Sequence, residues 1–314
     1  MSFASRVLAA VVVGCMFSVT AHAARVAILS NAWSAETAAD YRVKIPGHVF
    51  TGIDVSESVP ALDTLLANFD VVLLFEDTVF VNATAVGNRV AEFARAGRAV
   101  VLGTFYDQDR SDLTGGNTVP HGWGALEAID PNTTDGVGTA YAVRTLAPAS
   151  IVAHPLTRDV KSLAALRGNP GPYAGGNQAK PGTTVVAAWA QPNARGSVDP
   201  AIAYRQTGPA CVIHIGIAPQ YGVLTKFGTF GTDFAGDFYH AWKNAFDFGA
   251  GGCRLVIPGD FGQIGIGWAS RAELDAWRTA FTFAIVLDGK VLQSGFGPAL
   301  QLTTHPDGRI TTTG

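Results

Sequence analysis

Acidic and aromatic side chains follow the short apolar runs that the sequence predicts to be strands. Glu76-Asp77 and Tyr106-Asp107 each come just after such a run. In an open parallel sheet, ligands bind outside the carboxyl ends of the strands. Rings stack on the faces of sugars and carboxylates accept hydrogen bonds from hydroxyl groups, so this mixture favours a small polar ligand such as a saccharide. The candidate ligand-binding residues at the predicted strand ends are Trp33, Glu76, Asp77, Thr104, Tyr106, Asp107 and Tyr221.

Two other interpretations of the same residues stay open. Glu76 and Asp107 could supply the two carboxyl groups that hydrolysis of a glycosidic bond needs, which would make the chain a glycan-directed hydrolase. Alternatively, Trp33 only covers the end of the sheet while Glu76 and Asp77 cap the next helix. The chain would then be a structural module of a larger exported protein.

Composition and motifs argue against several other classes of site. The 22 basic and 25 acidic residues give a net charge of −3 without a Lys/Arg run, so no nucleic-acid partner is expected. The histidines lack metal-ligand spacing, and Asp112 stands where a calcium loop starting at Asp107 needs glycine, so no metal is predicted. His214 lies inside an apolar run and is interpreted as a core residue. Walker A and G-x-S-x-G motifs are also absent from the sequence, and no cofactor is predicted.

Alternating strands and helices must position the candidate residues. The apolar runs 26–29, 71–75, 99–102 and 212–215 are typical of strands that are buried on both faces. Helical stripes follow Pro60 and Asn82, and the second one stops at Gly97. This alternation predicts an α/β fold for residues 24–251, with a doubly wound, flavodoxin-like, mostly parallel sheet. Residues 104–150 show no sustained period and are interpreted as a long insertion.

The two ends of the chain differ from this central part. Residues 1–23 combine Arg6, an apolar run and Ala21-His22-Ala23, which predicts a signal peptide and an exported, periplasmic or extracellular protein. A lipoprotein anchor at Cys15 is the alternative, and no membrane span is expected after the signal is removed. Residues 252–314 contain a helix-capping pattern at 270–273. Around 281–292, two strand-like segments flank an Asp-Gly turn, which is typical of a β-hairpin. We expect a small β-rich segment there, complete or truncated.

Two cysteines, Cys211 and Cys253, remain after the predicted cleavage. In an oxidising compartment an even pair can form a disulfide, and two buried free thiols are the equal alternative. The sequence does not give the distance between them. If their Cα atoms lie within about 7 Å, we expect the pair to be oxidised.

Residues 69–107 resemble the class I glutamine amidotransferase-like superfold and, more narrowly, ThuA-like (trehalose-utilisation) proteins. The segments 153–160, 208–217 and 242–249 are similar to the family's His-Pro segment, late core strand and closing helix. The resemblance makes His154 a further candidate site residue. The chain departs from the amidotransferases at Thr104, because no cysteine follows that strand and no thiolate is available for their acyl-enzyme chemistry. Together with the predicted signal peptide and the residues at the strand ends, the resemblance favours a secreted, non-catalytic ThuA-like domain protein that binds a carbohydrate or another small polar ligand.

Overall fold

The structure is a computed structural model of the whole chain. It describes residues 23–77, 80, 82–108, 122–134, 143–166, 178–192, 196, 198–224 and 234–253, and the backbone of four strands between 283 and 313. The predicted signal peptide up to residue 22, the alternative anchor at Cys15 and the capping pattern at 270–273 lie outside the described residues.

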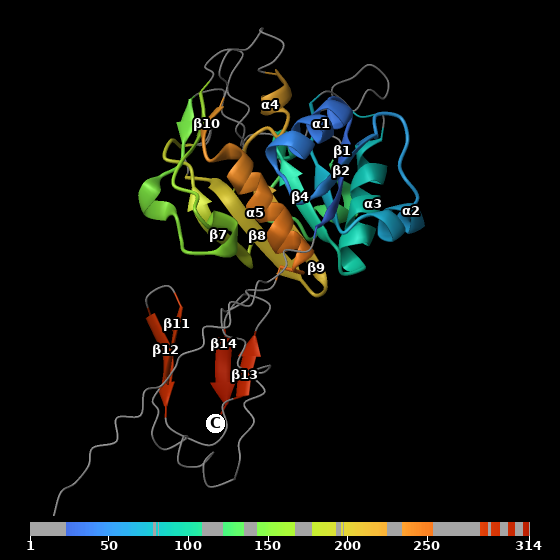
Figure 1. The fold of residues 1–314 in the computed structure, drawn as a ribbon. Coiled ribbons are helices and arrows are strands. Elements are labelled where there is room, and N and C mark those ends of the chain that lie inside the picture. The colour runs from blue at the N-terminus through green and yellow to red at the C-terminus, as the bar shows by residue number, and fades with distance from the viewer. Residues whose placement is uncertain are drawn as a thin grey trace, which may run out of the picture.

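A seven-stranded sheet forms the centre of the protein, with the order β2-β1-β3-β4-β9-β8-β7 (Figure 1). The first five strands pair in parallel, and β8 and β7 continue the sheet in antiparallel pairing. The fold class is therefore mixed α/β with a mostly parallel sheet, as the sequence predicted. The strands are β1 (Arg25–Ser30), β2 (Val49–Asp54), β3 (Val71–Leu74), β4 (Ala99–Gly103), β9 (Ala210–Ile215), β8 (Pro200–Thr207) and β7 (Thr183–Ala188).

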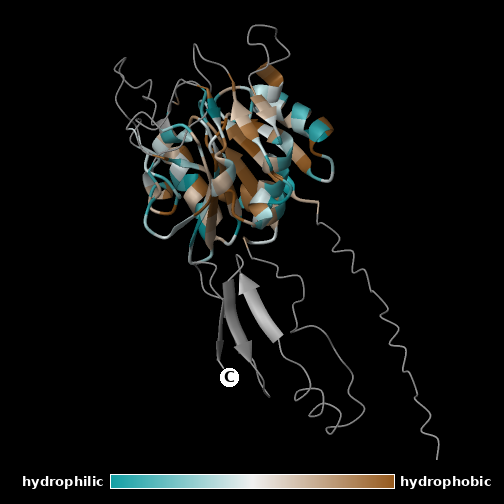
Figure 2. Cartoon of the chain, turned by 90° about the vertical axis from the view of Figure 1, so that its left-hand side faces the viewer, coloured by the Kyte–Doolittle hydropathy of each residue, from teal (hydrophilic) through white to brown (hydrophobic). Residues whose placement is uncertain are grey.

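Helices cover both faces of this sheet. Side chains alternate between the two faces along each strand, so Val71 and Leu73 enter one core while Val72 and Leu74 enter the other. The first core includes α1 (Ser34–Lys44) and α5 (Phe238–Ala250), and the second includes α2 (Leu62–Asn68) and α3 (Ala83–Arg95). Figure 2 shows the hydrophobic residues gathered in the sheet between these helices. Burial on both faces explains why the central strands are continuously apolar.

Local sequence signals set the bounds of α3. Asn82 is its N-cap, and the Asn82 Oδ1 atom accepts a hydrogen bond from the Ala85 N–H at 2.9 Å. Gly97, just beyond the helix, has a φ of 85°, a left-handed conformation that favours glycine and turns the chain toward β4. Both signals were predicted from the sequence.

Smaller elements lie outside the seven-stranded sheet. A three-stranded antiparallel sheet contains β5 (Arg144–Thr145), β6 (Leu163–Ala165) and β10 (Phe234–Gly236). Short helical turns are η1 (Tyr106–Gln108), η3 (Gly124–Leu126), η4 (Pro148–Ser150), η5 (Pro155–Thr157) and α4 (Tyr221–Leu224). The segment 242–249, which resembles the family's closing helix, lies within α5, and α5 begins at Phe238 directly after β10.

The described C-terminal strands form two antiparallel pairs, β11 (Phe283–Leu287) with β12 (Lys290–Gly295) and β13 (Gln301–Thr304) with β14 (Ile310–Thr313). The first pair is the hairpin that the sequence predicted. A disulfide joins Cys211 at the start of β9 to Cys253 after α5, with their Cα atoms 6.2 Å apart. In the part of the chain that the structure describes, no helix has the length and apolarity needed to cross a membrane.

Candidate functional site

The connections of the sheet create a switch point at the carboxyl ends of β1 and β3. The chain leaves the carboxyl end of β1 through α1 to reach β2 on one side, and it leaves the carboxyl end of β3 through α3 to reach β4 on the other side. Adjacent connections that diverge in this way leave a crevice, where open α/β sheets bind ligands. The loops at this crevice are joined, because the Asn31 Oδ1 atom accepts a hydrogen bond from the Asp77 N–H at 3.0 Å. The predicted residues Trp33, Glu76 and Asp77 lie in these two loops.

Trp33 has an unusual backbone at the start of α1. Its φ of 62° and ψ of 12° are left-handed, which is an outlier for a residue with a bulky side chain. The Trp33 carbonyl oxygen accepts the first hydrogen bond of the helix, from the Thr37 N–H at 2.9 Å. Its indole packs only partly against the core. Backbone strain of this kind gathers at binding sites, where the surrounding structure maintains it.

Backbone hydrogen bonds join the segments that follow β3, β4 and β9 next to the switch point. The Phe105 N–H donates to the Glu76 carbonyl oxygen at 3.0 Å, and the Thr104 N–H donates to the Ile217 carbonyl oxygen at 3.3 Å. The side chains of Glu76 and Thr104 are buried at this edge, while Asp77 is half-buried. The structure thus brings Glu76, Asp77 and Thr104 to the same edge of the sheet as Trp33.

Two of the predicted aromatic residues are buried inside the protein. The Tyr106 ring stacks on Trp123 with centroids 4.9 Å apart, and its hydroxyl donates to Asp130 Oδ2 at 2.8 Å. Tyr221, in α4, is fully buried and stacks on Phe234 with centroids 6.2 Å apart. The expectation that both rings offer a face to a sugar therefore needs correction, since both side chains are fully buried. Trp33 is the predicted aromatic residue that keeps exposed surface.

His154 lies away from the carboxyl edge. It precedes η5, where its Nδ1 atom accepts the Leu156 N–H at 3.1 Å. Its ring stacks on Tyr204 of β8 and makes an edge contact with Phe248 of α5. Burial lowers the pKa of His154 to about 4. These contacts give His154 a structural role in the packing between β8 and α5.

Asp107 belongs to a buried charged layer that sequence reasoning did not find. Its Oδ2 atom lies 3.6 Å from the Nδ1 atom of His214 in β9, and each residue is 1% exposed. Asp199, at the start of β8, forms a fully buried ion pair with Arg144 of β5. Burial, aided by the negative charge of Asp199, raises the pKa of Asp107 to about 8. A carboxyl group of this kind is neutral at neutral pH and can donate a proton.

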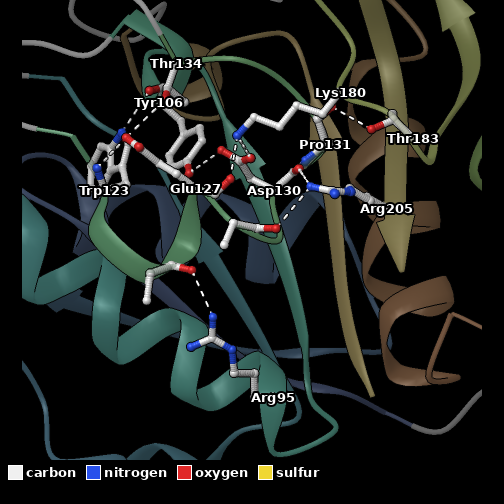
Figure 3. Close-up of polar contacts among 12 residues, drawn as sticks. Arg95, Tyr106, Trp123, Glu127, Asp130, Pro131, Thr134, Lys180, Thr183 and Arg205 are labelled. Carbon is white, nitrogen blue, oxygen red and sulfur yellow. Dashed lines mark hydrogen bonds and ion pairs between the residues drawn. The ribbon is translucent and has the colours of Figure 1, made fainter. Parts of the chain in front are cut away.

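A second buried carboxyl group lies beside this pair. Asp130 accepts the Tyr106 hydroxyl and also pairs with the Lys180 ammonium group, as Figure 3 shows. Burial raises the pKa of Asp130 to about 7, although Lys180 opposes the rise. Within the described residues, no group of three or more His, Cys, Asp or Glu side chains has the arrangement to hold a metal ion.

No family model matches the sequence. No curated protein matches it either. Among solved structures, the chain is similar to a cytoplasmic protein from Salmonella typhimurium (13% identity, 71% of this chain and 98% of that chain, TM-score 0.44). It is also similar to a ThuA-like protein from Bacteroides uniformis (12% identity, 71% and 89%, TM-score 0.40). A third similar structure is a β-galactosidase from Rahnella sp. R3 (16% identity, 65% and 31%, TM-score 0.41). These similarities assign no activity to this chain.

Proposed function

We propose that this chain is an exported protein with a flavodoxin-like, ThuA-like domain that binds a small polar ligand, most simply a saccharide, without turning it over. The binding site is the switch point between β1 and β3. The observation that carries the proposal is Trp33, a partly buried indole held in a left-handed backbone conformation beside the linked loops of Asn31 and Asp77.

The chemistry of these groups suits a sugar. An indole offers a flat apolar face to the C–H side of a pyranose ring, and it loses little conformational entropy on binding. The Asp77 carboxylate can accept hydrogen bonds from sugar hydroxyl groups. Such sites use a few polar groups to orient a ligand that an aromatic surface holds.

The test is a glycan array followed by calorimetry on the mature protein and its variants. The sharpest variant is Trp33→Gly, because glycine adopts a φ of 62° freely and the loss of the ring is separated from backbone strain. We expect Trp33→Gly to weaken binding at least about tenfold, Asp77→Asn to weaken it a few-fold, and Trp33→Phe to retain much of it. The matched control is Val43→Ala, at a residue that is 76% exposed at the far end of α1.

Two outcomes would replace this proposal with an alternative. Steady release of sugar products that disappears in Glu76→Gln would favour the hydrolase that uses Glu76 and Asp107. Absence of binding to every saccharide on the array would favour the structural module. Export is tested separately by intact-mass analysis: we expect a mature chain that begins at Ala24, and a lipidated chain that begins at Cys15 would contradict signal-peptide cleavage after Ala23.

A further inference from the structure

Ala24, the residue before β1, is held by hydrogen bonds on both sides of its backbone. It is fully buried, whereas Ala23 before it is exposed. Its carbonyl oxygen accepts the Val49 N–H at 2.9 Å, and its own N–H donates to the Nδ1 atom of His48 at 3.2 Å. Cleavage after Ala23 would turn this same nitrogen from a peptide amide into an α-amino group.

His48 connects the Ala24 nitrogen to a carboxylate. Its side chain is 2% exposed and makes edge contacts with Phe50 and Phe246. Because Nδ1 accepts a hydrogen bond, the proton of the neutral imidazole is on Nε2. The Nε2 atom lies 3.1 Å from the Oδ1 atom of Asp247 in α5. The imidazole therefore lies between the start of the folded chain and the carboxyl group of Asp247.

The carboxyl group of Asp247 is ionised. Burial raises its pKa, but the contacts with His48 and Lys243 outweigh this effect and hold the pKa below its usual range. The Lys243 ammonium group pairs with the Oδ2 atom at 2.5 Å, while the Oδ1 atom faces His48. Asp247 also lies in the last turn of α5, and the carboxyl end of a helix favours a positive charge nearby. This side of the imidazole therefore favours a cation at the Ala24 nitrogen.

The other charged groups of the adjoining elements are engaged away from His48. Besides Asp247 and Lys243, they are Arg25, Arg42, Lys44, Asp70 and Arg98. Arg25 and Arg98 pair with Asp70 and donate to carbonyl oxygens of α2, so they lie on the opposite face of the sheet. In α1, Arg42 donates to the Phe50 carbonyl oxygen and Lys44 lies over the Tyr239 ring.

We propose that His48 and Asp247 form a binding site for the α-ammonium group that cleavage after Ala23 creates, so that the cut chain is more stable than a chain in which Ala24 keeps a peptide bond. This inference rests on the cleavage in the proposed function and is independent of saccharide binding. The ammonium group keeps one N–H toward His48 and turns its other hydrogens toward the exposed position that Ala23 leaves, which limits the cost of burying the charge. A hydrogen bond from a charged donor is about twice as strong as one from a neutral amide.

The test compares the mature chain from Ala24 with the same chain acetylated at its α-amino group. Acetylation removes the charge and restores an amide N–H, so it separates the charge from the hydrogen bond. In urea unfolding at pH 7, we expect acetylation to raise the equilibrium constant for unfolding about tenfold.

Two variants and a control identify the groups responsible. Asp247→Asn should reduce the effect of acetylation to about twofold, because the carboxylate is gone. Lys243→Met removes the competing cation and should leave the effect at least as large. Asp63→Asn, which removes an exposed carboxyl group in the first turn of α2, is the matched control and should leave the effect unchanged.

The effect should also depend on pH in one direction. An α-amino group in an unfolded chain releases its proton near pH 8, and a neighbouring carboxylate makes the folded protein keep that proton to a higher pH. The stabilisation by the free amine is therefore complete below about pH 8 and is lost as the pH rises further, so the free and acetylated chains should approach equal stability by about pH 10.

Two results would overturn the site itself. One is equal stability of the free and acetylated chains at pH 7, since an amide makes an ordinary structural hydrogen bond equally well. The other is an undiminished effect of acetylation in Asp247→Asn. If that variant fails to fold, the unchanged chain and Lys243→Met still decide. A secreted chain whose mass shows another first residue would contradict the proposed cleavage and with it this inference, whereas the expected mass without an acetylation effect contradicts the site alone.

Discussion

Arg144 and Asp199 form a buried ion pair. Removing one partner should strongly reduce the free energy of unfolding, whereas replacing both partners by apolar residues should change it little. Both side chains are 0% exposed, and the Arg144 Nη1 atom donates to Asp199 Oδ2 at 2.9 Å. The guanidinium also donates to the Gln191 carbonyl oxygen at 2.7 Å and lies over the Trp189 ring. Arg144→Met keeps much of the volume and removes all of these donors. It leaves the Asp199 carboxylate buried near Asp107 without its cation.

The expected loss follows from the geometry. With the charge centres about 4 Å apart and an effective dielectric constant of about 20, Coulomb's law gives about 4 kcal/mol. Measured losses for breaking one partner of a buried pair are about 3–5 kcal/mol. We expect Arg144→Met to reduce the free energy of unfolding by that amount. The double variant Arg144→Met/Asp199→Leu removes both charges, and replacement of a buried pair by apolar residues is often close to neutral.

Guanidinium unfolding followed by tryptophan fluorescence measures these differences. The matched control is Lys243→Met, which removes a cation from the partly exposed pair of Lys243 with Asp247 on α5 and should cost less than about 1 kcal/mol. The reasoning fails if Arg144→Met costs no more than this control. It also fails if the double variant is as unstable as the single one, because the loss would then come from packing and not from the unpaired charge.

Three further predictions concern the rest of the domain. The double variant Cys211→Ala/Cys253→Ala opens a link across 42 residues, for which loop entropy predicts a loss of about 4 kcal/mol in unfolding experiments, and an unchanged stability would contradict it. The pKa of His154 is lowered to about 4, so the unfolded chain takes up a proton there first and stability falls as the pH drops from about 6.5 toward 4. In His154→Asn, which can still cap η5, melting temperatures at pH 7 and pH 4.5 should differ less than in the unchanged protein, and an equal difference would exclude His154 as the cause. In Gly87→Ala, the new Cβ atom would stand 1.9 Å from the Trp123 carbonyl oxygen. Calorimetry should therefore show that the free energy of unfolding falls by about 1–3 kcal/mol. An unchanged free energy would mean that the backbone at Trp123 can shift without loss of stability.

The central strands and α3 could be predicted because local sequence and tertiary burial agree there. Four consecutive apolar residues form β3, and five residues from Ala99 to Gly103 form β4, both buried on two faces. By contrast, α1 buries Ser34, Thr37 and Asp40 in addition to apolar residues, which weakens its helical stripe. The edge strand β2 alternates poorly and contains Gly52, where a Cβ atom would stand 2.4 Å from the Ser34 carbonyl oxygen at the start of α1. For these reasons neither α1 nor β2 is predicted from the sequence.

The sequence predicts where the candidate site residues lie along the sheet, but not which of their side chains are buried. Strand ends place Glu76 and Asp107 at the carboxyl edge, whereas Tyr106 and Tyr221 are covered by Trp123 and Phe234, rings beyond the next loop whose position no local pattern predicts. The charged layer was not predicted because Asp130 and Lys180 lie in segments whose apolar residues follow neither a helical nor a strand periodicity. His214 could have been recognised as more than a core residue, since a histidine in an apolar strand needs a polar partner when it is buried.

The disulfide between Cys211 and Cys253 has a mechanical consequence. The chain after Cys253 leads to the C-terminal strands, and a pull on that part reaches the disulfide at the end of α5. The covalent bond passes the load into β9, which is hydrogen-bonded to β4 on one side and β8 on the other. Tension therefore cannot peel α5 from the sheet turn by turn. It must instead shear a central strand from both neighbours at once, so the domain resists traction from its C-terminal side far better in the oxidised form than in the reduced form.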